Sequence, residues 1–227
     1  MVKILLFFSI VVLFLYKMLA QIDANSLMGI PMATTAERLA ITGITEGNMV
    51  YDTDINRLFE YTDTGWLEIL TSNNTYLGVF QITGATPAQI TVPGIPFAPT
   101  SVSFVAHPNI EVLDINADNS VGNNDNTSNN SFGTMNGFAR GSGKTIDQQQ
   151  VIYLGANGNS INDISRFASS DHAIGIRYGN QNGNNLGVIT GEVIEFTSDG
   201  FIIEVTYANG SQNVGNEDLV VLFTAYR

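Results

Sequence analysis

The sequence predicts an all-β protein: an antiparallel β-sandwich or jelly roll preceded by a small helix-plus-meander module. Short apolar or alternating runs recur from residue 76 to the end, separated by turn signals such as "NG", "SDG" and "ANG". No segment in this region carries the 3.6-residue periodicity of a helix. Only 13 % of residues are charged, so the polar surface must come from Asn, Thr, Ser, Gln and Gly, which suit the turns of an exported β-protein.

The large domain is expected over residues 76–227 and should contain eight or nine strands. Alternation is clearest in "SVSFVAH" and "FIIEVTY", where one face of the strand is apolar and the other is mixed. The strands are expected in "YLGVFQIT", "AQITVPG", "SVSFVAH", "IEVLDI", "QQVIYLG", "HAIGIRYG", "GVITGEVIEFT", "GFIIEVTYA" and "LVVLFTAYR". The last run is so apolar that it must be buried, either in the core or between subunits.

The first twenty residues predict export. Lys3 is followed by an apolar run of signal-peptide length over residues 4–16, and Ala20 suits the position before a cleavage site. The alternative is an uncleaved membrane anchor, which is the only way this chain is expected to engage a membrane. Residues 21–33 are expected to form a linker. We therefore expect a secreted or cell-surface protein, with a virion surface as the alternative.

Residues 34–71 predict the small module. Thr34, followed by Glu37, fits a capping box at the start of a short helix, which Thr42-Gly43 should end. The runs "NMVYD", "RLFEY" and "WLEIL" are separated by tight turns and predict a three-stranded meander. A piece this small is marginal alone, so it should pack against a neighbour, with Trp66 as its apolar plug.

The same residues resemble a connector module of phage tail or head fibres, which also recurs in secreted proteins of Bacteroidetes-type bacteria. In the large domain, the order of the expected strands and the Asp199-Gly200-Phe201 turn resemble those of the C-terminal β-sandwich of tail-fibre and receptor-binding proteins. The resemblance implies a homotrimer and, for some relatives, binding to cell-surface glycans. The matching positions in the module are Pro31, Thr34 to Arg38, Glu46-Gly47, Tyr51 to Tyr61 and Trp66.

Charge and composition exclude several classes of function. The net charge is −12, and it becomes −14 if residues 1–20, which contain Lys3, Lys17 and no acidic residue, are removed. Such a surface repels phosphate backbones, so nucleic acid is not an expected partner. The chain has no cysteine, which excludes disulfides and thiolate metal sites. A cation is the more compatible kind of ligand.

The segment "DINADNSVGNND" predicts a calcium loop. Oxygen-bearing side chains recur at alternate positions and an acidic residue closes the loop, as in calcium loops of the dockerin kind. The alternative is a flexible, Asn-rich surface loop. The candidate metal ligands are Asp114, Asn116, Asp118, Ser120 and Asp125.

The segment "RYGNQNGNN" is the first candidate for a carbohydrate site, because Tyr, Asn and Gln side chains can stack on a sugar and bond its hydroxyls. The alternative is an ordinary hairpin tip. The candidate ligand-binding residues are Arg177, Tyr178, Asn180, Gln181 and Asn182.

No catalytic signature is present. "FARGSGKT" lacks the first Gly of a phosphate-binding loop, and Asp171-His172 are adjacent, so on a strand they would face opposite ways. Glu192, Glu195 and Glu204 fit solvated strand faces. We therefore expect an exported, non-enzymatic structural or adhesion protein, fibre-like and homotrimeric, without a cofactor other than calcium. The alternative is a lectin-like carbohydrate- or receptor-binding module, and a hydrolase on a β-sandwich is the third hypothesis.

Overall fold

The structure is a computed structural model that describes residues 29–69, 74–84, 88–114, 116 and 125–227. Contacts divide the chain into two compact units, Met1–Ser72 and Asn73–Arg227, which we call the small unit and the large unit. Each unit is described by itself. The predicted signal peptide, residues 1–20, lies outside the described residues, as does the first part of the predicted linker.

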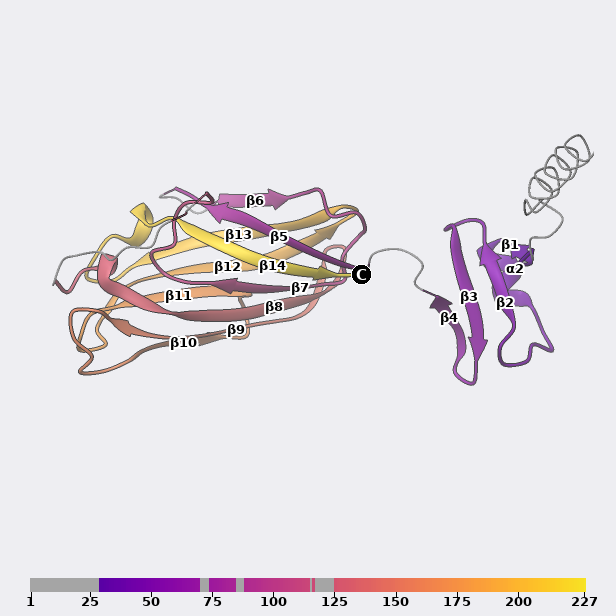
Figure 1. The fold of residues 1–227 in the computed structure, drawn as a ribbon, viewed down its shortest axis with the longest axis horizontal. Coiled ribbons are helices and arrows are strands. Elements are labelled where there is room, and N and C mark those ends of the chain that lie inside the picture. The colour runs from indigo at the N-terminus through magenta and orange to yellow at the C-terminus, as the bar shows by residue number, and fades with distance from the viewer. Residues whose placement is uncertain (1–28, 70–73, 85–87, 115, 117–124) are drawn as a thin grey trace, which may run out of the picture. The chain divides into compact units, whose positions relative to one another are not determined.

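The small unit is a short helix beside a four-stranded sheet, as Figure 1 shows. The sheet order is β1-β2-β3-β4; β1 pairs with β2 in parallel, and the other pairs form the predicted antiparallel meander. The helix-plus-meander prediction is thus confirmed. The elements are β1 (Met32–Ala33), α2 (Thr35–Ala40), β2 (Met49–Asp52), β3 (Arg57–Thr62) and β4 (Gly65–Ile69).

The predicted capping box starts the helix. Thr34 is the N-cap; its hydroxyl accepts a hydrogen bond from the Glu37 backbone N–H, and the Glu37 carboxylate accepts one from the Thr34 N–H at 2.8 Å. The Thr34 N–H and the Thr34 hydroxyl both donate to the Glu37 carboxylate and lower its pKa. The capping box also uses two backbone donors that would otherwise lack partners at the helix start.

A buried ion pair joins α2 to the sheet of the small unit. Arg38 Nε donates to Asp52 Oδ2 at 2.9 Å, and both side chains are buried. Thr35 Oγ1 donates to the same carboxylate, and the Arg38 guanidinium lies 3.8 Å from the centre of the Phe59 ring. Burial raises the pKa of Asp52, but the hydrogen bonds from Arg38 and Thr35 outweigh it and lower that pKa below its ordinary value.

We expect Asp52→Asn to unfold the small unit selectively. The substitution leaves the Arg38 guanidinium buried without its counter-charge, which is a large penalty in a unit with so small an apolar core. Hydrogen exchange should show loss of amide protection over residues 32–69 and retention of protection in the large unit. Asp63→Asn makes the same change of charge in an exposed turn and should leave protection intact. Equal protection in the two variants would contradict a structural role for the pair.

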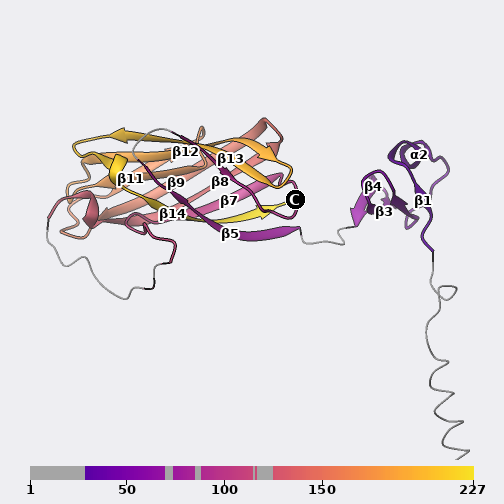
Figure 2. The same cartoon turned by 90° about the horizontal axis from the view of Figure 1, so that it is seen from above.

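The large unit is an antiparallel β-sandwich. A six-stranded sheet in the order β10-β9-β8-β7-β14-β5 packs on a four-stranded sheet in the order β11-β12-β13-β6. Figure 2 shows the two layers, with β12 and β13 in one and β14 and β5 in the other. The predicted all-β fold is confirmed. The strands are β5 (Thr75–Ile82), β6 (Ala88–Val92), β7 (Ser101–Ala106), β8 (Ser131–Ser142), β9 (Thr145–Asn157), β10 (Ser165–Ser169), β11 (Ile174–Gly179), β12 (Asn185–Thr197), β13 (Gly200–Asn209) and β14 (Leu219–Tyr226).

An aromatic cluster lies at the centre of the sandwich core. Phe201 from the four-stranded sheet is completely buried. Its ring centre lies 5.3 Å from that of Phe223, 5.5 Å from that of Phe104 and 5.8 Å from that of Phe80, all with steep interplanar angles. The three partners belong to the six-stranded sheet. Phe201 therefore connects the two sheets through edge-on aromatic contacts.

The observed strands differ from those expected from the sequence in three places. The expected strand over "IEVLDI" is irregular backbone and turn in its described part, residues 110–114. Strands β8 and β10 were not expected. Glycines in β8 mark close approaches of the backbone: a Cβ on Gly137 would lie 1.8 Å from the Ala173 carbonyl oxygen, and one on Gly141 would lie 2.1 Å from that of Thr145. "FARGSGKT" is thus part of the β8–β9 hairpin, and no helix follows it.

Two short 3₁₀ helices, η2 (Ser128–Asn130) and η3 (Val214–Asn216), lie at the end of the large unit away from the C-terminus. The connection after β7 and the β11–β12 loop reach the same end (Figure 1). Hydrogen bonds join these segments: Gln181 N–H donates to Asn126 Oδ1, and Ser128 N–H donates to Gln212 Oε1. The fold therefore gathers several Asn-rich loops at one end, which we call the polar end.

Candidate functional surfaces

The outer face of the six-stranded sheet carries many large exposed apolar side chains, with the exposed Arg140 of β8 and Arg166 of β10 on the same face. Side chains alternate along β14, with Val221 and Phe223 buried and Leu222 exposed between them. Leu222 lies in a row of paired residues that crosses all six strands without a charged side chain: Ala168, Ile152, Asn136, Val105, Leu222 and Val79. We call this surface the apolar face. Its large exposed side chains are Leu77, Val79, Phe132, Phe138, Ile152, Leu154 and Leu222.

The exposure of these side chains is high for residues of their type. Leu77 is 75 % exposed, Ile152 58 % and Leu222 56 %. Monomeric soluble proteins rarely show contiguous apolar patches larger than a few hundred Å². Six strands about 4.8 Å apart, with outward positions about 6.7 Å apart along each strand, give the sheet a face of roughly 700 Å². That is close to the ~800 Å² that each partner contributes to a standard protein interface.

A groove of about 620 Å³ hollows one end of the apolar face. Phe132 and Leu154 line it from β8 and β9, and Ile161 and Ile164 line it from the β9–β10 connection. On its other side lies the segment after β7, where His107 Nδ1 lies 2.9 Å from the Gly133 carbonyl oxygen. The groove is large enough for one or two side chains of a partner protein.

The outer face of the four-stranded sheet has the opposite character. Glu192 and Glu204 are exposed and directly paired across β12 and β13, and Glu195 lies 3.7 Å from the exposed Lys144 ammonium. Their flanking outward positions include Thr190 and Thr206. None of the three glutamates lines a described groove. This surface is acidic and solvated, so the two outer faces of the sandwich differ sharply.

The predicted calcium loop is described only at its ends. Asp114 and Asn116 are exposed, and Asp118 and Ser120 lie outside the described residues. Asp125 Oδ1 accepts hydrogen bonds from Thr127 Oγ1 at 2.6 Å, Thr127 N–H at 3.1 Å and Asn130 Nδ2 at 2.9 Å. These bonds lower the pKa of Asp125. One oxygen of Asp125 is thus occupied in ordering the chain before η2.

The predicted carbohydrate residues lie in and beside the β11–β12 loop, but most of their polar atoms are used internally. Arg177 donates to Ser165 Oγ at 2.6 Å and to the Gly183 carbonyl at 2.9 Å. Asn180 Oδ1 accepts from the backbone of Asn182, and Gln181 Oε1 accepts from Asn159. Asn182 is exposed, although its Oδ1 accepts from Asn162 Nδ2.

Tyr178 requires a correction. It is completely buried in the sandwich core and cannot stack on a sugar. The sequence places it at a period-two position of β11 that faces inward with Ile174 and Ile176. Its apolar neighbours in "HAIGIRYG" indicate this inward position, whereas the Asn-rich composition of the following loop favours a ligand-binding role.

A carboxylate pair at the polar end had no sequence signature. Glu111 lies in the segment after β7, and Glu217 lies between η3 and β14, with its carboxylate accepting from Ser128 Oγ at 2.8 Å. Burial, the hydrogen bond with Glu217 and the negative charges of Glu217 and Asp218 raise the pKa of Glu111 to about 7. The two glutamates are far apart in the sequence, so their proximity depends on the folded topology.

The Glu111 shift predicts a pH dependence of stability in a metal-free buffer. Because the pKa of Glu111 is higher in the folded protein than its ordinary value of 4.5, the contribution is fully present below pH 4.5 and is lost as the pH rises through about 7. The melting temperature of the large unit should therefore fall between pH 5 and pH 8. Glu111→Gln should flatten this slope. A slope that is unchanged in Glu111→Gln would contradict the assignment.

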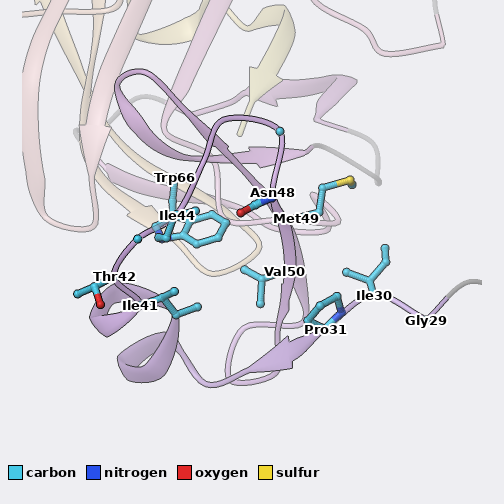
Figure 3. A pocket seen from close by; sticks show the side chains of 12 residues that line it. Gly29, Ile30, Pro31, Ile41, Thr42, Ile44, Asn48, Met49, Val50 and Trp66 are labelled. Carbon is cyan, nitrogen blue, oxygen red and sulfur yellow. The ribbon is translucent and has the colours of Figure 1, made fainter.

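The small unit has a groove of its own, about 560 Å³ in volume. Trp66, Ile41, Ile44, Val50 and Pro31 are among the side chains that line it (Figure 3). Trp66 is half-buried; it packs edge-on against Tyr61 at 5.2 Å, and its Nε1 donates to the Arg38 carbonyl at 3.0 Å. Trp66 therefore has a structural position in the small unit as well as an exposed edge in the groove.

No protein-family model matches the chain, and no curated protein matches it. In the part of the chain that the structure describes, no helix combines the length and the apolar character needed to cross a membrane.

Proposed function

We propose that this chain is an exported structural or adhesive surface protein that works by assembling with copies of itself through the apolar face, and that it performs no catalysis. The observation that carries the proposal is the contrast between the two outer faces of the sandwich. One presents a row of paired residues without charge, and the other presents paired glutamates. Soluble monomers rarely expose so many large apolar side chains on one face, and such surfaces commonly mark interaction sites.

A second copy of the chain is the occupant that fits best. The estimated area of the apolar face is close to what one partner contributes to a standard interface. Its central row offers no charge for an oppositely charged partner to recognise, while the acidic face would repel an identical acidic face. Self-association therefore buries the apolar face and leaves the acidic faces in solvent. Three copies are expected if the resemblance to fibre proteins extends to their assembly.

The sequence features at the N-terminus support export, and a chain without cysteine must gain stability outside the cell by means other than disulfides, of which subunit assembly is one. Glycan binding remains the alternative function. Of the residues expected to contact a sugar, Tyr178 is buried, and Arg177, Asn180 and Gln181 make internal hydrogen bonds. We therefore place assembly ahead of carbohydrate recognition.

Sedimentation equilibrium of residues 21–227, the expected mature chain, tests the proposal. We expect a mass that is a whole multiple of the chain mass, three for the fibre-like case, and that does not change when a chelator is added. A single-chain mass at every protein concentration would overturn the proposal.

A further inference from the structure

We propose that the groove at one end of the apolar face binds a free fatty carboxylate, an unbranched hydrocarbon chain that ends in one carboxylate. The apolar walls of the groove hold the hydrocarbon chain, and Arg166 at the rim pairs with the carboxylate. The proposed assembly is not a premise of this inference, because all the residues of the site belong to a single chain.

Hydrocarbon side chains form most of the wall of the groove. Phe132 and Leu154 line it from β8 and β9, and Ile110, Ile161 and Ile164 line it from the neighbouring connections. Ile161 is 61 % exposed and Leu154 57 %, so an apolar occupant would remove much apolar surface from water. The volume of about 620 Å³ lies within the usual range of small-molecule sites, about 300–1,000 Å³.

Arg166 lies at the rim of the groove. It is paired directly with Leu154 across β10 and β9, and both side chains are on the exposed side of the sheet. Directly opposite residues have Cβ atoms about 4.5–5.5 Å apart, so the long Arg166 side chain can reach the mouth of the groove beside Leu154. Ile164, which lines the groove, precedes Arg166 closely in the chain.

The Arg166 guanidinium has no acidic partner in the part of the chain that the structure describes. Asp163, the acidic residue nearest to it in the sequence, instead accepts a hydrogen bond from the Ile164 N–H at 2.7 Å. The chain as a whole has a net charge of −12, so a free cation beside an apolar groove is a distinctive feature. It matches a ligand that is apolar along its length and anionic at one end. The ion pairs between described residues join Arg38 to Asp52, Arg57 to Glu68 and Lys144 to Glu195.

The lining of the groove favours a hydrocarbon chain over a peptide. Among the described residues that line it, only His107 and Thr134 have side chains that form ordinary hydrogen bonds. His107 Nδ1 lies 2.9 Å from the Gly133 carbonyl oxygen, which can only accept, so this ring atom donates within the protein. A bound peptide would bring backbone N–H and C=O groups that need partners, whereas a hydrocarbon chain brings none.

Calorimetric titration of residues 21–227 with decanoate, below the concentration at which it forms micelles, tests the proposal. We expect saturable binding of one decanoate per chain. Decanol, which has the same chain without the charge, should bind about tenfold more weakly, because it lacks the charge-assisted bond to Arg166. Arg166→Gln should remove this difference between the two ligands. Arg140→Gln takes the same charge from the same face, roughly 20 Å along β8 from Thr134, and should preserve the difference.

Leu154→Ser removes part of the apolar wall at an exposed position, where folding should tolerate it, and should weaken the binding of both ligands. Equal affinity for decanoate in the original protein and in Arg166→Gln would overturn the proposal. Tighter binding of an apolar tripeptide with a free carboxyl end than of decanoate would also overturn it, because the groove would then suit a protein terminus.

A parallel titration of Leu222→Lys separates ligand binding from assembly, because Leu222 does not line this groove. We expect this variant to bind decanoate even if assembly of the original protein closes the groove. Sedimentation of the same samples reports the proposed assembly independently. Decanoate binding to a protein that stays single at every concentration would support this inference while overturning assembly. The absence of saturable binding in both proteins would overturn this inference whatever the assembly state.

Discussion

Phe201→Ala is expected to destabilise the large unit by about 3–5 kcal/mol, the usual cost of removing a fully buried aromatic ring. The reason is the position of the ring: it contacts Phe80, Phe104 and Phe223 across the interface of the two sheets. Its removal leaves a cavity at the point where, among the described residues, aromatic contacts join both layers. Urea unfolding of the large unit, at fixed protein concentration so that assembly does not shift the midpoint, measures this loss.

Phe201→Leu is the matched control for that experiment. It keeps an apolar side chain of moderate size in the same place, so the loss of free energy of unfolding should be clearly smaller. If the alanine and leucine variants unfold at the same urea concentration as the original protein, the aromatic cluster does not join the sheets in the way described.

Leu222→Lys is expected to dissociate the assembled protein into single chains. Leu222 lies in the uncharged row between Val105 and Val79, so assembly would bury each new ammonium without a counter-charge. A penalty of about 3 kcal/mol for each buried charge corresponds to a change on the order of a hundredfold in the dissociation constant. Sedimentation velocity should show the single-chain species as the main component.

Thr206→Lys makes the same addition of charge on the exposed surface of the acidic face and should leave assembly unchanged. Both lysines make the net charge less negative, so general repulsion between chains cannot explain a difference between the variants. Dissociation by both substitutions, or by neither, would contradict the assignment of the interface to the apolar face.

Local patterns predicted much of the fold. The capping box of Thr34 and Glu37 and the meander turns depend on residues close in sequence, and the structure contains both. Strands β8 and β10 could not be predicted from local sequence, because tertiary packing determines that these residues form strands. The glycines of β8 resemble turn signals in isolation, and only the packing of Gly137 against Ala173 explains why a strand needs them.

The apolar face and the pair of Glu111 and Glu217 were harder to predict from the sequence. The run "LVVLFTAYR" predicts that the last strand must be buried. The apolar face also depends on the pairing of Leu222 with Val105 and Val79, which the sequence does not specify. Glu111 and Glu217 meet only through the connections that end at β14. Calcium binding by the loop over residues 114–125 remains a prediction, because residues 115 and 117–124 lie outside the described residues.

The most direct test of the central proposal is the reactivity of single cysteines, since the natural chain has none. Ile152→Cys and Leu222→Cys report on the apolar face, and Thr206→Cys reports on the acidic face. A thiol reagent should modify Thr206→Cys quickly and the other two slowly at high protein concentration, with the protection lost on dilution. Equally fast modification at all three positions would show that the apolar face is open to solvent and would contradict assembly through it.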